Sequence, residues 1–467
     1  MQRKTLLQIL QVVLGILMGV LITLSVVRYR ERQHLYNTRY GEWRKLNLIL
    51  DLVEKNYVDT LNREGMTNAA VEAALAKLDP HSVYLPPQQL KDSEQDLAGN
   101  FDGIGIQFNV PNDTAIVLEV IAGGPSEKVG LMPGDRLLKV DDKVIAGVKF
   151  PQDSMVRRMK GPSGTKVTIT VGRGKEVIPF EITRGKIPVH SVDAAFMIKP
   201  GVGYIRLGKF SRTTFEECHK AAMDLLDQGM AHLLFDVRDN SGGYMDQALL
   251  LSNDFLSPGD TIVYIEGLHR PKEVYKADGR GTLQSVGVTV LVSENSASAS
   301  EIFAGAIQDN DRGKVVGRRS FGKGLVQEPF FFTDNSGIRL TVARYYTPSG
   351  RCIQKPYVSQ RDYAYDIYNR YADGEVFSAD SVRLDTTDVH HTRSGRVVYG
   401  GGGIMPDVFV PMDTTRASAF YVACNRKATQ MRYASHVFDR NRARLTIIDN
   451  YADMDRFLQG IDFKADF

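Results

Sequence analysis

The second half of the chain alternates between short apolar runs and longer amphipathic segments. Four apolar runs are typical of strands: GVGYIRLGKF, HLLFDVR, VTVLVSE and KVVGR. Three segments between them have apolar residues at the spacing of a helix face: TTFEECHKAAMDLLDQGM, YMDQALLLSNDFL and SEIFAGAIQDND. Strands that alternate with helices form parallel βαβ units. From Gly201 onward, the pattern therefore predicts an α/β fold.

Upstream of this region, the hydrophobic pattern changes twice. Residues 41–78 have apolar positions at helical spacing, and the prolines of DPHSVYLPP interrupt that spacing at residues 79–87. From about Gly99 to Arg184, short apolar runs such as AIVLEVI and KVTITV alternate with turns that contain Gly and Pro. We therefore expect a helical segment followed by a β-rich domain. Residues 355–467 have weak periodicity and predict little.

An uncharged run of 22 residues extends from Leu6 to Val27. As a helix it would be roughly 33 Å long, which is enough to cross the core of a bilayer. No A-x-A-like cleavage site follows it, so an uncleaved signal anchor is favoured over a secretory signal. Basic residues flank both sides: Arg3 and Lys4 precede the run, and Arg28, Arg30, Arg32 and Arg39 follow it. Taken alone, the positive-inside rule would place the large domain in the cytoplasm.

Composition and charge narrow the class of protein. Hydrophobic residues make up 43% and charged residues 24% of the 467 positions, which is globular composition with length for about three domains. The net charge of +3 is too close to balance to favour a nucleic-acid partner. The three cysteines lie far apart and match no metal-ligand spacing. We expect neither a metal site nor a cofactor.

Three serines alternate with alanines in ENSASASEIF, at Ser296, Ser298 and Ser300. Ser298 and Glu301 match the S-x-x-E capping box, so one interpretation is a helix cap without a catalytic role. The other interpretation is a nucleophile. Ligand crevices lie at the carboxyl ends of strands in α/β sheets, and a helix N-terminus presents N–H groups to an oxyanion. The decapeptide by itself favours the cap, whereas its position after a predicted strand favours the nucleophile.

A nucleophilic serine needs a base that takes its proton. None of the nine histidines lies between His269 and His390 or in a recognisable catalytic motif, so a lysine is considered instead. Lys323 lies in SFGKGLVQ, between two glycines and after the predicted strand KVVGR. Desolvation lowers the pKa of a lysine, and a buried lysine beside a serine can act as general base. A solvated lysine in an exposed turn is the alternative.

The stretch SASASEIFAGAIQDNDRGKVVGRRSFGKGLVQ resembles, without gaps, the core of the carboxyl-terminal processing proteases, also called tail-specific proteases. These are Ser/Lys endopeptidases with an embedded PDZ domain. The resemblance extends through DPHSVYL, DVRDNSGG and RYYTPSGRCIQ and covers about residues 40–355. It implies a crotonase-like α/β protease core with an inserted, mostly β PDZ domain, an N-terminal helical segment and a transmembrane anchor. The implied boundaries are an anchor over 1–30, a helical segment over 40–95, a PDZ domain over 96–185, a protease core over 186–355, and a C-terminal region over 356–467 that is partly core-completing and partly helical.

The resemblance also implies catalytic residues. Ser298 aligns with the nucleophile, Lys323 with the general base, and Gln327 with a residue that orients the lysine. Asp309 aligns with an acidic position implicated in some members, for which a structural carboxylate at a helix end is the alternative. Ser296 remains as a structural or capping hydroxyl, as does the last serine of the run.

The implied oxyanion donors are the backbone N–H of Ala299 and the turn Gly242-Gly243. Ser241 precedes this turn where the family commonly has a proline, which leaves the geometry of the turn open.

The resemblance to PDZ domains rests on FDGIGIQF and GPSEKVGLMPGDRLLKVDDK. In PDZ domains, such a loop offers N–H groups to the terminal carboxylate of a peptide, and the following strand pairs with the peptide. The candidate peptide-binding residues are Gly103, Ile104, Gly105 and Ile106. An ordinary Gly-rich turn before a strand is the alternative.

The resemblance implies a membrane-anchored serine endopeptidase with a periplasmic or other extracytoplasmic catalytic domain, contrary to the charges around the anchor. Its partners would be proteins with unstructured C-terminal tails and the membrane, whereas a homo-oligomer or an adaptor is left open. One alternative is a PDZ scaffold or adaptor with an inactive or gated protease core. Another is a penicillin-recognising enzyme, because Ser320 and Lys323 form S-x-x-K, but no K-T-G follows.

Overall fold

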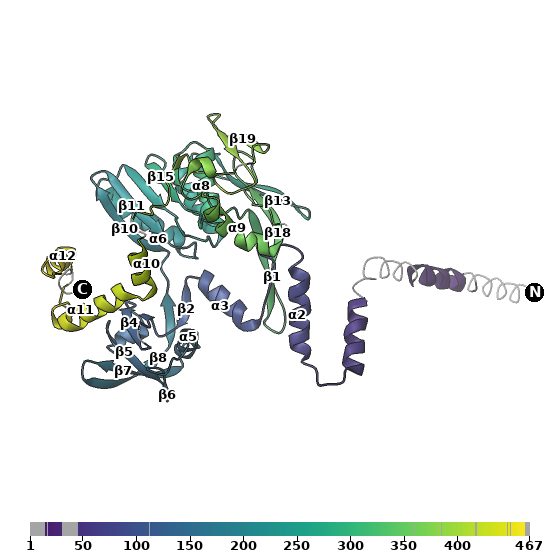
Figure 1. Cartoon of the computed structure of the whole chain (residues 1–467). Coiled ribbons are helices and arrows are strands. Elements are labelled where there is room, and N and C mark those ends of the chain that lie inside the picture. The colour runs from purple at the N-terminus through teal and green to yellow at the C-terminus, as the bar shows by residue number, and fades with distance from the viewer. Residues whose placement is uncertain are drawn as a thin grey trace, which may run out of the picture. The chain divides into compact units, whose positions relative to one another are not determined.

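A computed structural model of the chain describes residues 15, 17–29, 45–111, 113–357, 359–383, 385–415, 418–445, 447–448 and 450–462 (Figure 1). The chain divides into two compact units, Met1–Ala73 and Ala74–Phe467. In the first unit, residues 17–29 and 45–56 are helical, and helix α2 (Arg63–Leu75) begins there. Part of the predicted membrane run, residues 6–14 and Ile16, lies outside the described residues. Among those that are described, no helix has both the length and the apolar character needed to cross a bilayer.

The second unit contains a β-rich module, and the strands at the two ends of this module pair with each other. Strand β2 (Asn100–Gly103) pairs antiparallel with β9 (Gly185–Pro188), so the chain enters and leaves the module at one place. Between them, a sheet has the order β3-β4-β5-β7-β8, with β6 beside β5. Its strands are β3 (Ile106–Asn109), β4 (Ala115–Val120), β5 (Arg136–Val140), β6 (Lys143–Val144), β7 (Lys166–Arg173) and β8 (Glu176–Thr183), and its helices are α4 (Pro125–Lys128) and α5 (Gln152–Met159).

Alternation of apolar and polar positions explains this sheet. On β7, Val167, Ile169 and Val171 are buried, whereas the intervening residues are more exposed. Successive side chains of a strand point to opposite faces, so one face of β7 packs on the module's own core. The β-rich domain expected over residues 99–184 is therefore present as a separately packed module.

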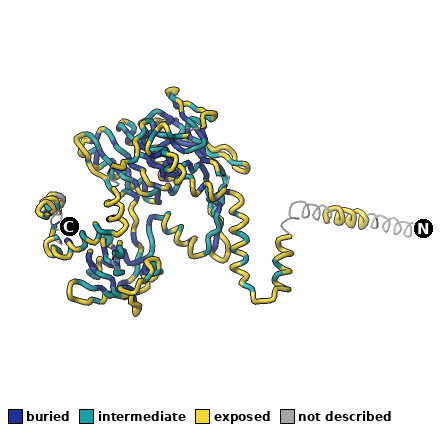
Figure 2. Tube along the Cα trace, in the orientation of Figure 1, coloured by how far each residue is buried: buried dark blue, intermediate teal, exposed yellow. Residues whose placement is uncertain are grey.

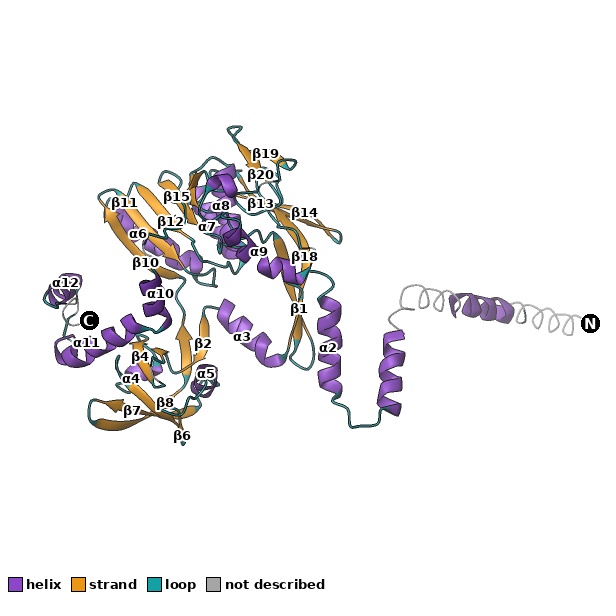
Figure 3. Cartoon of the chain, in the orientation of Figure 1, coloured by secondary structure: helices purple, strands orange, loops and turns teal. Residues whose placement is uncertain are grey.

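The main sheet of the second unit has six strands in the order β10-β11-β12-β15-β16-β21 (Figure 3). They are β10 (Val192–Lys199), β11 (Val202–Leu207), β12 (His232–Asp236), β15 (Gly287–Val292), β16 (Lys314–Gly317) and β21 (Val408–Phe409). β10 runs antiparallel to β11, and every other neighbouring pair is parallel. The predicted alternation of strands and helices from residue 201 onward is present, and β21 brings a piece of the C-terminal region to the edge of the sheet.

Three helices connect these strands: α6 (Thr214–Asp227), α7 (Met245–Phe255) and α8 (Ala299–Asp309). All eleven residues of α8 are buried. Phe303 of α8 packs against Phe235 and Phe255, with ring centroids 4.9 and 5.6 Å apart. Figure 2 shows how densely buried positions gather around this helix. The helix that follows the serine run is thus part of the hydrophobic core.

A second sheet carries residues that are far apart in the sequence. It has the order β1-β18-β13-β14, with β17 also paired to β18. Its strands are β1 (Val83–Leu85), β13 (Thr261–Gly267), β14 (Arg270–Lys276), β17 (Leu325–Phe331) and β18 (Gly337–Tyr346). Val83 of β1 lies opposite Arg339 of β18, so the DPHSVYL segment joins a strand more than 250 positions away. Helix α3 (Pro87–Leu97) follows β1 and leads into β2.

The C-terminal region is divided between short strands and helices. Helix α9 (Gln360–Ala372) precedes a short helical turn (Ala379–Ser381) and the strand pair β19 (Val389–His391) and β20 (Val397–Tyr399). Helices α10 (Ala419–Arg426), α11 (Thr429–Leu445) and α12 (Tyr451–Gln459) follow.

Candidate active site

The candidate site lies at the carboxyl ends of four neighbouring parallel strands. The segments that follow β11, β12, β15 and β16 carry Gly208, the turn Gly242-Gly243, Ser298 and Lys323, respectively. Carboxyl ends of adjacent parallel strands meet at one edge of a sheet, which is where open α/β sheets bind ligands. The fold therefore brings the serine run, the glycine turn and the lysine loop together.

The three serines of the run have different surroundings. The Ser296 hydroxyl donates to the carbonyl of Val237 at 2.7 Å, and the Ser300 hydroxyl donates to the carbonyl of Asn240 at 2.9 Å. Both side chains are fully buried. Ser298 is half-buried and lines a pocket. Of the three hydroxyl groups, that of Ser298 is therefore the one placed to meet a substrate.

Ser298 has a backbone conformation that L-residues rarely adopt. Its φ is +56° and its ψ is −113°, at the position just before α8. Strained backbone of this kind costs about 1–3 kcal/mol and persists where the surrounding structure enforces it. Here the Ser298 N–H donates to Glu301 Oε2 at 2.8 Å. The capping arrangement expected from S-x-x-E is thus present at the residue that faces the pocket, so the cap and the nucleophile are compatible interpretations.

Glu301 joins the serine run to the lysine loop. Oε2 accepts hydrogen bonds from the N–H groups of Ser298 and Lys323, and Oε1 accepts from the Ser320 hydroxyl and the Gly322 N–H. Complete burial raises the pKa of Glu301, whereas the four donors favour its carboxylate. Because three of the four donors are backbone N–H groups, which cannot accept a hydrogen bond from a protonated carboxyl, we assign the carboxylate. The buried Tyr345 hydroxyl adds a second link, because its single O–H points to the Lys323 carbonyl and also lies 3.2 Å from the Ser298 carbonyl.

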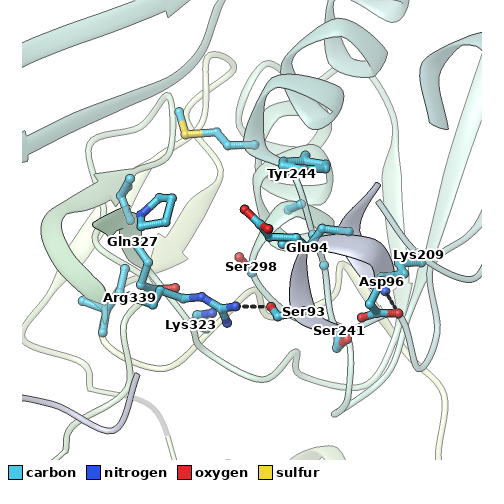
Figure 4. A pocket seen from close by; sticks show the side chains of 18 of the residues that line it. Ser93, Glu94, Asp96, Lys209, Ser241, Tyr244, Ser298, Lys323, Gln327 and Arg339 are labelled. Atoms are coloured by element: carbon cyan, nitrogen blue, oxygen red, sulfur yellow. Dashed lines mark hydrogen bonds and ion pairs between the residues drawn. The ribbon is translucent and has the colours of Figure 1, made fainter. Parts of the chain in front are cut away.

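Lys323 shares the pocket with Ser298 (Figure 4). The pKa of its amine is lowered to about 8, chiefly by burial and also by the positive charge of Arg339, while Glu301 and Asp79 act in the opposite direction. A lysine with a pKa near 8 is partly neutral at neutral pH and can accept a proton. Its environment is therefore that of a base and not that of a solvated turn lysine.

Gln327 lines the same pocket and is the third residue of β17. Its side-chain amide donates to Thr341 Oγ1 at 3.4 Å, and Thr341 Oγ1 donates to Asp79 Oδ1 at 3.1 Å. The Asp79 carboxylate also accepts hydrogen bonds from the N–H groups of His81 and Ser82. Asp79 of the DPHS segment thus accepts a hydrogen bond from Thr341, which in turn contacts the Gln327 side chain.

The backbone N–H groups at the glycine turn are not equivalent. The Gly242 N–H donates to the Asn240 side chain at 2.9 Å. In the part of the chain that the structure describes, the N–H groups of Gly243 and Ala299 have no acceptor. A Cβ atom on Gly242 would lie 2.8 Å from Ser298 Cβ and 3.0 Å from the Ala299 nitrogen, so the turn packs closely against Ser298. Gly243 and Ala299 are therefore the stronger candidates for oxyanion donors, and Gly242 provides the close approach.

The pocket has a volume of about 490 Å³. One wall is α3, which contributes apolar and charged side chains including Leu90 and Glu94. Ser298, Lys323 and the start of β17 also line the pocket. Further apolar lining comes from Leu85, Met245 and Ile302. A pocket of this composition, lined by the Ser298 side chain and next to two N–H groups that have no acceptor in the described part of the chain, suits acyl transfer on an extended peptide.

Asp309 lies at the other end of α8 from Ser298. Eleven residues at 1.5 Å each separate them by roughly 16 Å along the helix. Its carboxylate accepts hydrogen bonds from the fully buried Arg351 at 2.7 Å and from the Ser349 N–H at 3.2 Å. Asp309 does not line the pocket. The structure therefore places it in a buried ion pair behind the site.

The predicted peptide-binding residues lie at the end of β2, at the start of β3 and between these two strands. Gly103 ends β2, and Ile106 begins β3. Gly105 has a φ of +77°, which favours glycine. The Ile104 side chain is 3% exposed and belongs to the module's core. Ile104 can therefore offer a peptide its backbone but not its side chain.

Sequence reasoning missed several residues of the site. Asp79, Arg339 and Tyr345 reach Lys323 or its neighbours only through the second sheet. Asp79 lies in DPHSVYL and Tyr345 in RYYTPSG, two segments on which the family resemblance rests. That resemblance is the one signal in the sequence that points to these two residues. In the described residues, no group of three or more His, Cys, Asp or Glu side chains could hold a metal ion.

Known protein families match two parts of this chain. The model of Peptidase family S41 matches residues 201–363, and that of the PDZ domain matches residues 103–183. The "Probable CtpA-like serine protease" of Staphylococcus epidermidis is 31% identical over 376 residues, which cover 78% of this chain and 76% of that protein. The protein of the same name from Staphylococcus aureus is 32% identical over 349 residues, which cover 73% and 70% of the two chains. Among solved structures, a photosystem II D1 C-terminal processing protease is 26% identical with a TM-score of 0.43, and the match covers 81% of this chain and 88% of that one. This chain therefore belongs to peptidase family S41 and is a CtpA-like, carboxyl-terminal processing serine protease with a PDZ domain.

Proposed function

We propose that this protease cleaves protein substrates through an acyl-enzyme, with Ser298 as nucleophile and Lys323 as general base. The observation that carries the proposal is their joint placement: one half-buried hydroxyl and one desolvated amine line the same pocket at the carboxyl edge of the sheet. The proposed core is crotonase-like. Peptide substrates follow from the family and the PDZ domain.

In the proposed mechanism, the Ser298 hydroxyl oxygen attacks the scissile carbonyl while Lys323 Nζ takes its proton. Negative charge develops on the carbonyl oxygen, where the N–H groups of Gly243 and Ala299 stabilise it. Collapse of the tetrahedral intermediate expels the amine of the leaving peptide, and Lys323 returns the proton to that nitrogen. Water, deprotonated by Lys323, then attacks the acyl-enzyme and regenerates the Ser298 hydroxyl.

The PDZ domain would select the substrates. In the proposed complex, an unstructured C-terminal tail pairs with β3, and its carboxylate meets the N–H groups of the loop that includes Gly103 and Gly105. The proposed location is extracytoplasmic, with the chain held at the membrane by Leu6–Val27. A homo-oligomer or an adaptor would act on the same tail-binding step.

The test uses the full chain in detergent with an unfolded protein and a C-terminally tailed reporter. Cleavage by the parent and by Ser296→Ala, together with its loss in Ser298→Ala and Lys323→Ala, supports the dyad. The Ser296→Ala variant is the matched control, because its hydroxyl is bonded within the core two positions away. Equal cleavage by all four proteins would reject the assignment. Tail binding without cleavage by the parent would favour the scaffold alternative.

A further inference from the structure

Arg339 is a charged residue of the pocket to which the proposed mechanism gives no role. It lies on β18, between Val83 of β1 and Pro329 of β17. Its side chain is half-buried and lines the pocket together with Lys323 and Gln327. Its guanidinium donates a hydrogen bond to the Ser93 hydroxyl on α3. Figure 4 shows this contact, with the Lys323 side chain beside the Arg339 head group.

Arg339 shares the pocket with Lys323, and two nearby carboxylates favour the protonated form of that lysine. The two carboxylates that influence Lys323 are Glu301 and Asp79, and both favour its charged form. Arg339 is the cation that acts against them. The further ionisable groups packed nearby are His81, Lys355, Tyr345 and Tyr363, and Glu94, Asp96 and Lys209 line the pocket farther along α3 and the β11 loop.

These other groups do not replace the charge of Arg339. Burial and the charge of Lys323 lower the pKa of His81 to about 4, so its imidazole is neutral at neutral pH. The Lys355 amine is paired with Asp366 at 2.9 Å and lies over the rings of Phe321 and Tyr363. Tyr345 and Tyr363 have pKa values raised by burial and stay neutral.

We propose that Arg339, held by Ser93, is a positioning residue that keeps the Lys323 amine unprotonated and so prepares it to act as base. The proposal rests on the proposed function, because it assigns to Lys323 the role of base. A guanidinium suits this task, since it stays protonated at any pH at which the protein is folded. The hydrogen bond to Ser93 fixes the position of the guanidinium group and therefore of its positive charge. Because α3 leads directly into β2 and the PDZ domain, any movement of α3 would also move this charge.

The sign of the effect follows from electrostatics. Removing a positive charge stabilises a neighbouring cation, so the pKa of Lys323 rises when Arg339 becomes neutral. Lys323 is then protonated up to a higher pH, and the acid limb of the rate profile moves to higher pH. At pH 7, kcat/KM falls by about three- to tenfold, and it recovers on the alkaline side of the profile.

The experiment measures kcat/KM from pH 6 to 10 for the full chain and for Arg339→Gln, Arg339→Lys and Ser93→Ala. Arg344→Gln is the matched control, because Arg344 lies on the same strand, bonds the Tyr357 hydroxyl and does not line the pocket. We expect the acid limb to move to higher pH in Arg339→Gln, to move less in Ser93→Ala, and to stay near the parent value in Arg339→Lys and Arg344→Gln.

A second readout does not depend on cleavage. In a Ser298→Ala background, the labelling of the Lys323 amine by an amine-reactive reagent is quantified by mass spectrometry at each pH. Arg339→Gln should raise the midpoint of labelling there as well. An unchanged midpoint in both assays would overturn the proposal while leaving the dyad intact. Conversely, residual cleavage by Ser298→Ala would refute the proposed function, and the labelling midpoint would still report on Arg339.

Discussion

Glu301→Gln tests whether one buried carboxylate aligns Ser298 and Lys323, the proposed nucleophile and base. The substitution keeps the shape of the side chain but turns one acceptor oxygen into a donor. With that NH₂ group toward Ser298 and Lys323, two backbone N–H groups would face a donor. With the amide reversed, the NH₂ group faces the Ser320 hydroxyl and the Gly322 N–H. The Ser320 hydroxyl can turn and accept, so the reversed amide leaves one N–H without an acceptor.

This count sets the expected magnitude. A buried N–H that loses its acceptor costs about 1–3 kcal/mol. We therefore expect the free energy of unfolding to fall by about that amount. If the same strain displaces the Lys323 loop, kcat falls by roughly 5- to 150-fold. KM should change little, because the Glu301 side chain is fully buried and does not line the pocket.

The assay combines urea unfolding with steady-state cleavage of a peptide. Glu294→Gln is the control, since Glu294 is also buried and bonds Arg318 and Tyr371 away from the pocket. It should lower stability and leave kcat of the folded protein near the parent value. The reasoning would be refuted if Glu301→Gln kept both the stability and the kcat of the parent, or if its loss of activity appeared in KM alone.

Two further predictions concern the turn and the buried ion pair. Gly243→Ala places a Cβ 2.0 Å from the Phe210 carbonyl oxygen at a φ of +146°, so we expect cleavage to drop at least 100-fold by loss of an oxyanion donor; a soluble, folded variant with parent kcat would contradict the assignment. Asp309→Asn leaves Arg351 buried without its counter-charge, and we expect a loss of about 3–5 kcal/mol in urea unfolding. After correction for the folded fraction, its kcat should match that of the parent, and a large fall in kcat would restore a catalytic role for Asp309.

The hydrophobic pattern predicts the main sheet and not the second one. Buried parallel strands such as β12 and β15 are short, almost wholly apolar runs, and the helices between them have a clear period. In contrast, β18 is half-buried along most of its length, and β1 has three residues. The stretch IRLTV of β18 does alternate, but β1 is too short to show a period and no local pattern pairs the two strands, so sequence reasoning missed the residues they bring to Lys323.

In the candidate site, too, local sequence patterns predict some of the contacts, whereas only the tertiary fold brings the other residues together. The position of the serine run after a strand indicates a nucleophile, and S-x-x-E predicts the local bond between Ser298 and Glu301. The other bonds of Glu301 reach residues 19 to 22 positions away, which no local motif encodes. Likewise, the sequence predicts a glycine turn, but the side chain of Asn240 decides which N–H of that turn stays available.

The burial of α8 has a consequence for how this protease can be controlled. A helix without a solvent-facing side exchanges its amide hydrogens only when the whole domain opens, so α8 should be among the slowest-exchanging segments of the chain. Ser298, the proposed nucleophile, directly precedes that helix and cannot be withdrawn without unfolding the core. Helix α3, a wall of the pocket whose residues are mostly exposed or half-buried, can open at much lower free energy. Switching this enzyme on or off is therefore expected to change the deuterium uptake of α3 and to leave that of α8 unchanged.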